Sequence, residues 1–253
     1  MKTEPARRGH ASKPDKSTKR GRTLRTAPRT LREDVRAFKR EIVLSTAIEI
    51  FYRDGYQNST VDDIAAAMSV TKAVVYYYFE TKEAVLEAVI DRSAELSRAS
   101  IDRGLEEGTT PAQKLALACF HFAAHVLKDQ KIIGVYFRED RCFSRSLRAR
   151  TTISEKNLVA KLSQVIAAGI KSNAFRECDT RLMAKDIMGI ISMSYYWYRE
   201  GGQLSREALC RHFAAQALRL VGYEGEMALG ERPFELEWIA RQTAVINSRR
   251  DKY

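Results

Sequence analysis

The side chains best suited to chemistry in this sequence are hydroxyl and ammonium groups concentrated between residues 60 and 82. Thr71 and Lys72 directly precede a short apolar run, and Tyr76 and Tyr78 follow within two helical turns. Groups of this kind donate hydrogen bonds to phosphate oxygens and to the edges of DNA bases. The spacing therefore predicts contacts with nucleic acid, with Tyr76 and Tyr78 at the phosphate backbone.

Two short helices joined by a tight turn are expected to position these side chains. Thr60 has an acidic residue, Asp63, three positions later, which is the pattern of a helix N-cap with a favourable charge in the first turn. Ser69 begins the expected turn, and Thr71 is expected to cap a second helix that runs to Phe79. A helix-turn-helix of this kind places its second helix in the major groove of DNA.

The second helix cannot bury all three of its consecutive tyrosines, because neighbouring side chains on a helix point in different directions. We expect Tyr77 to lie inside, together with Val75 and Phe79. The small side chains after Lys72 can approach a thymine methyl group, and Lys82 offers a charge at the start of the next helix. The expected DNA-binding residues are Thr60, Thr71, Lys72, Ala73, Val74, Tyr76, Tyr78 and Lys82.

Residues 38–95 resemble the N-terminal DNA-binding domain of the TetR family of transcriptional repressors. The resemblance is carried by the run FYRDGYQNSTVDDIAAAMSVTKAVVYYYFETKEAVL, which keeps the family's motif elements in order. Three positions depart from the pattern: Ser69 replaces the usual turn glycine, Ala73 a frequent glycine and Tyr78 the common histidine. The resemblance implies a homodimer that binds a palindromic operator in double-stranded DNA and leaves it when a small-molecule effector occupies the C-terminal domain.

The body of the chain is predicted to be all-α, because long stretches free of proline are rich in Ala, Leu, Arg, Lys and Glu. After the first helix, from residue 33 to Asp54, and the DNA-binding helices, whose last member should end near Gly104 and Gly108, we expect helices near residues 112–128, 131–140, 146–172, 180–199 and 205–221. The breaks are expected at Gly134 or nearby polar residues, at residues 173–179, and at Gly201-Gly202. The expected domains are a disordered basic arm (1–32), the DNA-binding domain (33–95), an effector-binding and dimerisation domain (96–222), and a C-terminal extension with an amphipathic helix (223–253).

A dimer is also expected on geometric grounds, since one short recognition helix reads only a few base pairs and two-fold symmetry doubles that readout. Family members usually dimerise through their last two major helices, here residues 180–199 and 205–221. Both segments are apolar, although core packing alone would also explain their composition. The expected dimerisation residues are Ile187, Ile190, Ile191, Leu209, Phe213, Ala217 and Leu220.

The charge of the chain is concentrated at one end. Residues 1–32 hold eleven Lys or Arg residues and two acidic ones, so this arm carries nine of the eleven net positive charges. Few of its residues can be buried, so ordering it would cost more entropy than burial returns. We expect the arm to add salt-dependent affinity through phosphate or minor-groove contacts, the alternative being a solvated extension without function. Another hypothesis for the whole protein is non-specific DNA compaction by this arm, which predicts equal affinity for every DNA sequence.

Two features of the C-terminal half suggest an effector. An aromatic stretch, Tyr195-Tyr196-Trp197-Tyr198-Arg199-Glu200-Gly201-Gly202, resembles the WYRPGG-type segment of repressors that control sterol-ring and fatty-acid catabolism, some of which sense acyl-CoA thioesters. A cluster of five arginines between residues 138 and 150 could bind the phosphates of such a ligand. An uncharged lipophilic or aromatic effector, as in regulators of efflux, is the alternative. The expected effector-binding residues are Phe137, Arg138, Arg141, Arg145, Arg148, Trp197 and Tyr198.

A metal-dependent enzyme is the competing hypothesis from another class. His121 and His125 are four residues apart on one expected helix, within reach of a single zinc ion, but no third ligand follows at the next turn. Polar core residues with hydrogen-bond partners are the simpler interpretation, and the sequence holds no HExxH, P-loop or GxSxG motif. We therefore expect a DNA-binding regulator with no catalytic residues, metal or cofactor.

The remaining composition points to the cytoplasm. No apolar stretch is long enough to span a bilayer, and the N-terminus has no apolar core of a secretion signal, so no membrane partner is expected. The four cysteines lie far apart and form no CxxC pair, which is typical of small buried apolar residues in a reducing compartment.

Overall fold

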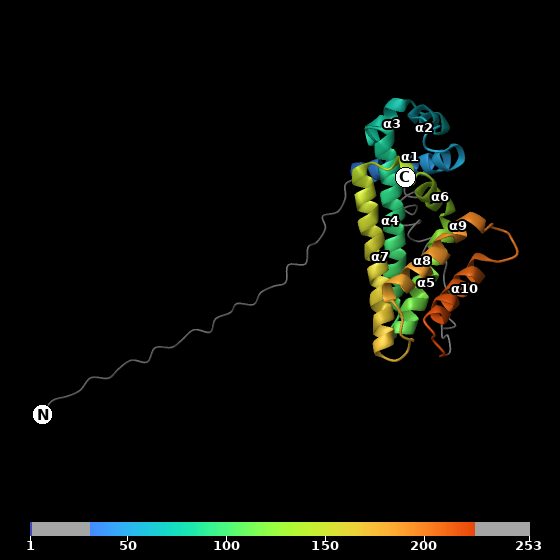
Figure 1. Ribbon diagram of the computed structural model, residues 1–253. Helices are drawn as coiled ribbons and strands as arrows, with labels where there is room; N and C mark the ends of the chain where they lie inside the picture. The colour runs from blue at the N-terminus through green and yellow to red at the C-terminus, as the bar shows by residue number, and fades with distance from the viewer. Residues whose placement is uncertain (2–30, 226–253) are drawn as a thin grey trace.

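The computed structural model describes Met1 and residues 31–225, and within these residues every regular element is a helix (Figure 1). The elements are α1 (Leu31–Asp54), α2 (Val61–Ala67), α3 (Lys72–Tyr78), α4 (Lys82–Glu107), α5 (Pro111–Lys128), α6 (Gln130–Arg138), the short 3-10 helix η1 (Asp140–Cys142), α7 (Arg145–Lys171), α8 (Thr180–Ser192), α9 (Ser194–Trp197) and α10 (Arg206–Leu220). The all-α prediction is confirmed. Apart from Met1 and residues 31–32 and 223–225, the expected basic arm and C-terminal extension lie outside the described residues.

Helices α1, α2 and α3 form a small head at one end of an elongated helical bundle (Figure 1). Helix α4 leads from the head into the bundle, where it packs along α5 and α7, and α10 packs on α5. The expected domain boundary at residue 95 falls inside α4, which continues without a break. Of the helices in the described part of the chain, none has the length and apolar character needed to cross a membrane.

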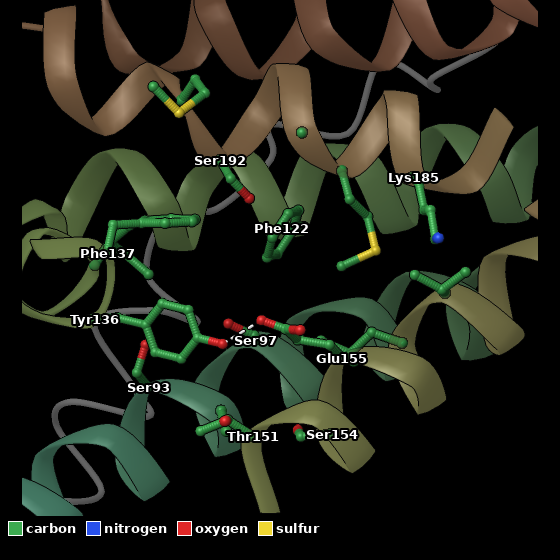
Figure 2. A pocket seen from close by; sticks show the side chains of 17 residues that line it. Ser93, Ser97, Phe122, Tyr136, Phe137, Thr151, Ser154, Glu155, Lys185 and Ser192 are labelled. Atoms are coloured by element: carbon green, nitrogen blue, oxygen red, sulfur yellow. Dashed lines mark hydrogen bonds between the residues drawn. The ribbon is translucent and has the colours of Figure 1, made fainter. Parts of the chain in front are cut away.

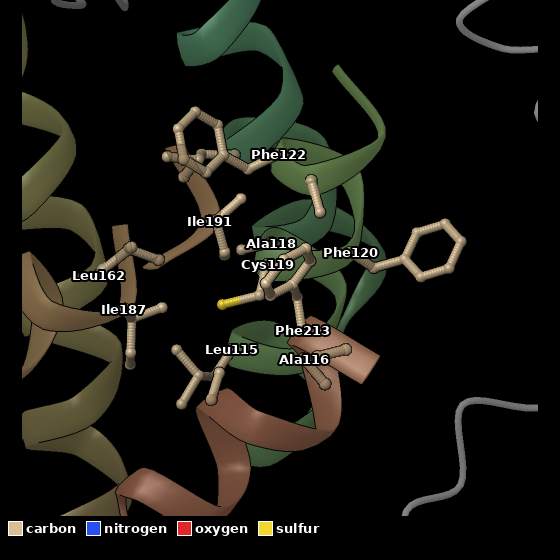
Figure 3. Packing of buried hydrophobic residues seen from close by; sticks show 14 of the residues in the cluster. Leu115, Ala116, Ala118, Cys119, Phe120, Phe122, Leu162, Ile187, Ile191 and Phe213 are labelled. Carbon is tan, nitrogen blue, oxygen red and sulfur yellow. The ribbon is translucent and has the colours of Figure 1, made fainter. Parts of the chain in front are cut away.

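The buried apolar residues form two clusters. One cluster fills the bundle with side chains from α5, α7, α8 and α10 (Figure 3). The other fills the head, and it includes residues from outside the head: Ile132, Ile133 and Val135 of α6, and Leu147 of α7. Helix α6 is therefore part of the core on which the helices of the head fold.

One expected helix is interrupted: the helix expected at residues 180–199 is divided at Met193, where α8 ends and α9 begins. The break between the helices expected at residues 112–128 and 131–140 lies at a polar residue, Asp129, whose backbone (φ −103°, ψ 39°) is not helical, and not at Gly134. Gly134 lies buried within α6. A Cβ atom at this position would come within 2.6 Å of the Tyr52 ring. The glycine allows α6 to approach α1 closely rather than ending a helix.

Helix α4 has Gly108 as its C-cap, where its end was expected, and the other expected glycine, Gly104, lies inside the helix. The helix reaches Glu107, and a Cβ atom at Gly104 would lie 2.1 Å from the backbone nitrogen of Ala118 on α5. Backbone atoms on the neighbouring helix cannot move aside as a flexible side chain can. The close packing of α4 against α5 therefore depends on this glycine.

We expect Gly104→Ala to lower the free energy of unfolding by about 1–3 kcal/mol, because the added methyl group forces α4 and α5 apart. The matched control is Gly189→Ala on α8, where a Cβ atom meets no other atom within 4 Å. That control should be stabilising by about 0.5–1 kcal/mol, since alanine favours the helix. Urea denaturation of both variants at equal protein concentration measures the difference; equal stabilisation by both would show that the α4–α5 contact is not tight.

Candidate nucleic-acid interface and ligand cavity

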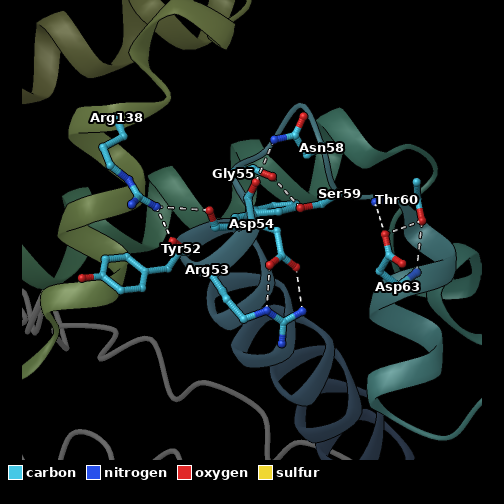
Figure 4. Close-up of polar contacts among 10 residues, drawn as sticks. Tyr52, Arg53, Asp54, Gly55, Asn58, Ser59, Thr60, Asp63 and Arg138 are labelled. Carbon is cyan, nitrogen blue, oxygen red and sulfur yellow. Dashed lines mark hydrogen bonds and ion pairs between the residues drawn. The ribbon is translucent and has the colours of Figure 1, made fainter.

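The first helix of the helix-turn-helix begins with a complete capping box at Thr60 (Figure 4). The Thr60 hydroxyl oxygen accepts a hydrogen bond from the Asp63 backbone N–H at 3.1 Å, and the Asp63 carboxylate accepts from the Thr60 N–H and hydroxyl at 2.7 Å each. These hydrogen bonds lower the pKa of Asp63. Because the hydroxyl proton of Thr60 is committed to Asp63, a phosphate contact from this residue would have to break the cap.

The turn between α2 and α3 is built on Ser69, whose φ angle is +56°. The Ser69 N–H donates to the Ala66 carbonyl and the Val70 N–H to the Ala65 carbonyl, both at 3.0 Å, so the chain reverses directly after α2. A left-handed backbone conformation favours glycine, which explains why a glycine is usual at this position in the resembling family. Val70 is half-buried against the core of the head.

Helix α3 presents a different set of tyrosines from the one expected. Val75 and Phe79 are buried as predicted, but Tyr77 is 64% exposed and Tyr78 is half-buried against the core. The prediction that Tyr77 lies inside is therefore wrong. Each residue advances about 100° around a helix. Tyr77 is two positions from both Val75 and Phe79 and therefore points to the opposite side of α3. Tyr78 is three positions from Val75 and therefore lies closer to the buried side.

The outer surface of α3 begins at Thr71 and continues through Lys72, Ala73 and Tyr76, all of which are exposed, with Val74 half-buried. Thr71 has the backbone geometry of an N-cap, but its side chain makes no capping hydrogen bond, unlike the cap we expected. Its hydroxyl is therefore available to a ligand. The Lys72 ammonium lies 3.4 Å from Asp62, and both side chains are well exposed, so this ion pair can exchange for a phosphate at little cost.

Lys82 lies inward of this surface. Its ammonium donates hydrogen bonds to the carbonyl oxygens of Tyr56 and Ser59, both at 2.7 Å, and lies 4.2 Å from the centre of the Tyr56 ring. The structure thus ties the start of α4 to the α1–α2 loop through this lysine. A phosphate contact from Lys82 would have to share the ammonium group with these two carbonyls.

Hydrogen bonds join the end of α6 to the end of α1 (Figure 4). The Arg138 guanidinium donates to the carbonyl oxygens of Phe51 and Tyr52 at the end of α1, and it lies 4.7 Å from the centre of the Tyr52 ring. The next residue, Glu139, accepts a hydrogen bond from the Tyr56 backbone N–H at 3.2 Å. Any displacement of α6 therefore acts on the loop that leads into the helix-turn-helix.

The bundle contains an apolar cavity of about 270 Å³ between α4, α5, α6, α7 and α8 (Figure 2). A hydroxyl-to-carboxylate hydrogen bond crosses it, from Tyr136 on α6 to Glu155 on α7. Burial and the neighbouring Glu155 carboxylate raise the pKa of the Tyr136 hydroxyl, so it stays protonated and can donate. The other lining residues are Ser93, Ala94, Ser97, Phe122, Ile133, Phe137, Thr151, Ser154, Leu158, Val159, Lys185, Met188, Gly189, Ser192 and Met193.

Of the residues expected to bind an effector, only Phe137 lines this cavity. Arg138 faces α1, Arg148 donates to the Asp140 carbonyl, and Arg141 and Arg145 are exposed. Trp197 is half exposed with its ring near Phe213, and Tyr198 is buried in the bundle core. The five-arginine cluster is a surface feature at the α6–α7 corner rather than part of the cavity wall.

Sequence reasoning missed most of the cavity lining. Ser93 and Ser97 are buried although polar, and they stand four residues apart on one face of α4. Such a pair of small polar residues on a buried helix face was the available signal, together with the methionines of α8. Tyr136 and Glu155 carry no local pattern, because their pairing joins two different helices, α6 and α7, rather than residues of one helical turn.

Most of the residues expected at a dimer interface belong to the core of the bundle. Ile187, Ile191, Leu209, Phe213 and Ala217 are buried within one chain, and Leu220 is packed against the same core (Figure 3). Ile190 alone of the expected set is a large exposed residue. The exposed apolar residues of this region lie on and beside α8 and α9: Leu182, Ile190, Met193, Tyr196, Trp197 and Leu204.

The two histidines of α5 have separate carboxylate partners. His121 Nε2 is 2.8 Å from Glu107, and His125 Nδ1 is 3.0 Å from Asp129. Burial lowers the pKa of His121, so its imidazole is neutral near pH 7. Residues 31–225 contain no group of three or more potential ligands that could hold a metal ion. The geometry supports the interpretation of these histidines as hydrogen-bonded core residues.

Comparison with protein families matches both parts of the chain. Residues 43–89 match the family described as bacterial regulatory proteins, tetR family, and residues 108–221 match the tetracyclin repressor-like C-terminal domain. The two matches together cover most of the head and of the bundle; residues 31–42 of α1 and residues 90–107 of α4 lie outside them.

Curated relatives and solved structures agree with that assignment. The chain is 26% identical to the fatty acid metabolism regulator protein of Bacillus subtilis over 150 residues, which are 59% of this chain and 77% of that protein. It is 23% identical to the transcriptional repressor KstR2 of Mycolicibacterium smegmatis over 185 residues, 72% of this chain and 90% of that protein. Among solved structures, the regulator AibR in complex with isovaleryl coenzyme A and operator DNA has a TM-score of 0.64 at 21% identity, covering 73% of this chain and 99% of that chain.

We expect Ser69→Gly to raise the free energy of unfolding by about 1 kcal/mol, because it removes the steric cost of a left-handed non-glycine residue. Ser69→Val should lower the free energy of unfolding, and by more than Ser69→Gly raises it, since a β-branched side chain is strongly disfavoured at this φ angle. Ser45→Gly, in the middle of α1, is the control and should be destabilising by about 0.5–1 kcal/mol. Thermal and urea denaturation measure all three variants; a destabilising Ser69→Gly would contradict a strained turn.

Proposed function

Because the chain belongs to the TetR family of transcriptional regulators, we propose that it is a cytoplasmic homodimeric repressor that binds a palindromic DNA operator and is released by a small lipophilic effector. The observation that carries this proposal is the exposed surface of α3, which offers the hydroxyl groups and the ammonium group of Thr71, Lys72 and Tyr76 on one short helix after a tight turn. Phosphates and base edges in the major groove are what such a surface binds.

Tyr77 joins this proposed contact surface. Its ring is exposed and lies 5.5 Å from the Arg36 guanidinium of α1, so a cation and a phenol side chain lie together on the surface of the head. Phosphate binding by this group would fix the angle of α3 in the groove, whereas Lys72, Ala73 and Val74 near the helix N-terminus would read bases.

The dimer is proposed to form along α8 and α9. The apolar residues exposed there, including Ile190 and Trp197, are of the type that a partner surface buries, and aromatic residues are enriched in interface cores. Two protomers then present two α3 helices to the half-sites of one operator. This assignment shifts the expected interface away from α10, whose apolar residues are occupied within the chain.

The effector is proposed to occupy the apolar cavity. A fatty or ring-shaped acyl group carried as a CoA thioester is supported by the similarity to the fatty acid metabolism regulator, to KstR2 and to AibR, whose structure holds isovaleryl coenzyme A. An uncharged lipophilic compound is the alternative. The acyl carbonyl could accept the Tyr136 hydroxyl in place of Glu155, since that hydroxyl is protonated and crosses the cavity.

We expect Lys72→Ala and Tyr76→Phe each to weaken operator binding about tenfold, because each removes a hydrogen-bond donor to DNA. The operator can be found by footprinting on the DNA that flanks the gene, with and without acyl-CoA thioesters, and fluorescence anisotropy then gives the affinities and two protomers per site. Lys171→Ala, at the far end of α7, is the matched control and should bind like the unchanged protein. Operator affinity unaltered in both α3 variants would exclude α3 as the recognition helix.

Loss of the Arg138 side chain should impair release from the operator by the effector more than it impairs operator binding itself. We expect Arg138→Gln to bind the operator within about threefold of the unchanged protein but to lose most of its release by octanoyl-CoA, since coupling between sites is typically 5–150-fold. The reason is that Arg138 joins α6, a wall of the cavity, to the carbonyl oxygens at the end of α1.

Arg145→Gln is the control for that experiment, because the Arg145 side chain is exposed one turn beyond η1 and should leave the response intact. The measurement is the ratio of operator dissociation constants with and without the thioester. A full response in Arg138→Gln would show that the signal does not pass through this contact.

A further inference from the structure

A second hollow lies directly beside the apolar cavity. It has a volume of about 410 Å³ and is lined by Arg98 of α4 and by Ser154, Asn157, Leu158, Ala160, Lys161 and Gln164 of α7. Ser154 and Leu158 also line the apolar cavity, so these two residues form the wall between the two spaces. We call this second space the α4–α7 hollow.

The α4–α7 hollow is chemically the opposite of the cavity. Its lining contains two cations, Arg98 and Lys161, two carboxamides, Asn157 and Gln164, and no acidic residue. Arginine and lysine bind phosphate by charge-assisted hydrogen bonds, and carboxamides donate hydrogen bonds to further oxygens. A ligand with negative charge suits this lining.

One carboxylate currently holds both cations. Asp102, one turn after Arg98 on α4, lies 3.3 Å from the Arg98 guanidinium and also pairs with the Lys161 ammonium. Asp102 itself is not among the residues that line the hollow. Together the three groups keep a net positive charge, which an incoming phosphate would neutralise.

The spacing of these groups along α7 suits a long ligand. A helix rises about 1.5 Å per residue, so Lys161 lies about 10 Å and Gln164 about 15 Å along the axis from Ser154 at the shared wall. A molecule that passes this wall therefore needs a polar arm of that length between its apolar part and its charged groups.

We propose that the α4–α7 hollow binds the phosphate-bearing part of an amphipathic effector whose apolar part lies in the adjoining cavity. The chemical class is an acyl chain joined through a polar arm to phosphate groups, as in CoA thioesters, and this proposal rests on the proposed function in which the cavity receives the effector. Arg98 and Lys161 bind the phosphates, and Asn157 and Gln164 hydrogen-bond the arm.

Other cations near the cavity fit this role less well. The arginine cluster at the α6–α7 corner does not line the cavity, and Arg138 and Arg148 are engaged with backbone carbonyls. Lys185 lines the cavity itself, but Glu155 lines it too and offsets its charge. The α4–α7 hollow is lined by two cations and is free of carboxylates.

The test compares ligands with and without phosphates on the full-length protein. Isothermal titration calorimetry would use octanoyl-CoA, the octanoyl thioester of pantetheine, which lacks phosphates, and lysophosphatidic acid, whose phosphate is close to its chain. We expect Arg98→Gln/Lys161→Gln to weaken octanoyl-CoA binding about tenfold and to leave octanoyl-pantetheine binding unchanged. Asp102→Asn, which releases both cations, should strengthen octanoyl-CoA binding without affecting octanoyl-pantetheine.

The control is Arg145→Gln/Arg148→Gln, which removes two charges from the arginine cluster and should not change either affinity. Circular dichroism and operator binding verify that each variant is folded. Two results overturn the phosphate site while leaving the cavity proposal intact. One is an equal loss of affinity for both thioesters in Arg98→Gln/Lys161→Gln, and the other is an unchanged affinity for octanoyl-CoA in that variant. Preference for lysophosphatidic acid over octanoyl-CoA would overturn the CoA-type arm. Failure of every thioester to bind the unchanged protein overturns the proposed acyl effector, and this inference with it.

Discussion

The close approach of α6 to the end of α1 is the constraint on which the rest of the structure depends. Gly134 allows the Tyr52 ring to lie where a Cβ atom would otherwise be, and Ile132, Ile133 and Val135 on either side of it complete the core of the head. Outside the head, α1 packs on α4 and on α6, both of which also line the cavity. A helix of nine residues thereby belongs to two functional parts of the molecule at once.

Under the proposed function, this dual membership would transmit the binding of an effector in the cavity to the helices of the head. Tyr136 and Phe137 line the cavity, while the next two residues, Arg138 and Glu139, hold the carbonyl and N–H groups at the end of α1. Because packed interiors are close to incompressible, a ligand that shifts Tyr136 must either repack α6 or move these contacts. The cavity and the head are thus joined by four consecutive residues rather than by a long chain of side chains.

The sequence predicted what is encoded locally and failed where distant segments meet. The all-α fold, the Thr60 cap and the Ser69 turn follow from residue types at fixed spacing, and each is present. Gly134 was expected as one position for a helix break, since glycine often ends helices. The reason for a glycine inside α6 is its contact with Tyr52, which is 82 residues away in the chain and leaves no local pattern. The tyrosines of α3 were assigned by residue type, whereas the phase set by Val75 and Phe79 decides which of them faces outward.

Lys82 shows how the two kinds of information combine. Its place at the start of α4 suggested a charge for DNA, yet its ammonium binds the carbonyl of Tyr56, the residue whose N–H donates to Glu139. Both backbone polar groups of Tyr56 are therefore held by side chains, the N–H by Glu139, which follows α6, and the carbonyl by Lys82 of α4. A helix of seven residues such as α3 has little stability of its own and takes its position from neighbouring packing. Displacing Glu139 would remove the hydrogen bond to the Tyr56 N–H while Lys82 keeps its bond to the Tyr56 carbonyl, so the loop before α2 would stay tied to the start of α4.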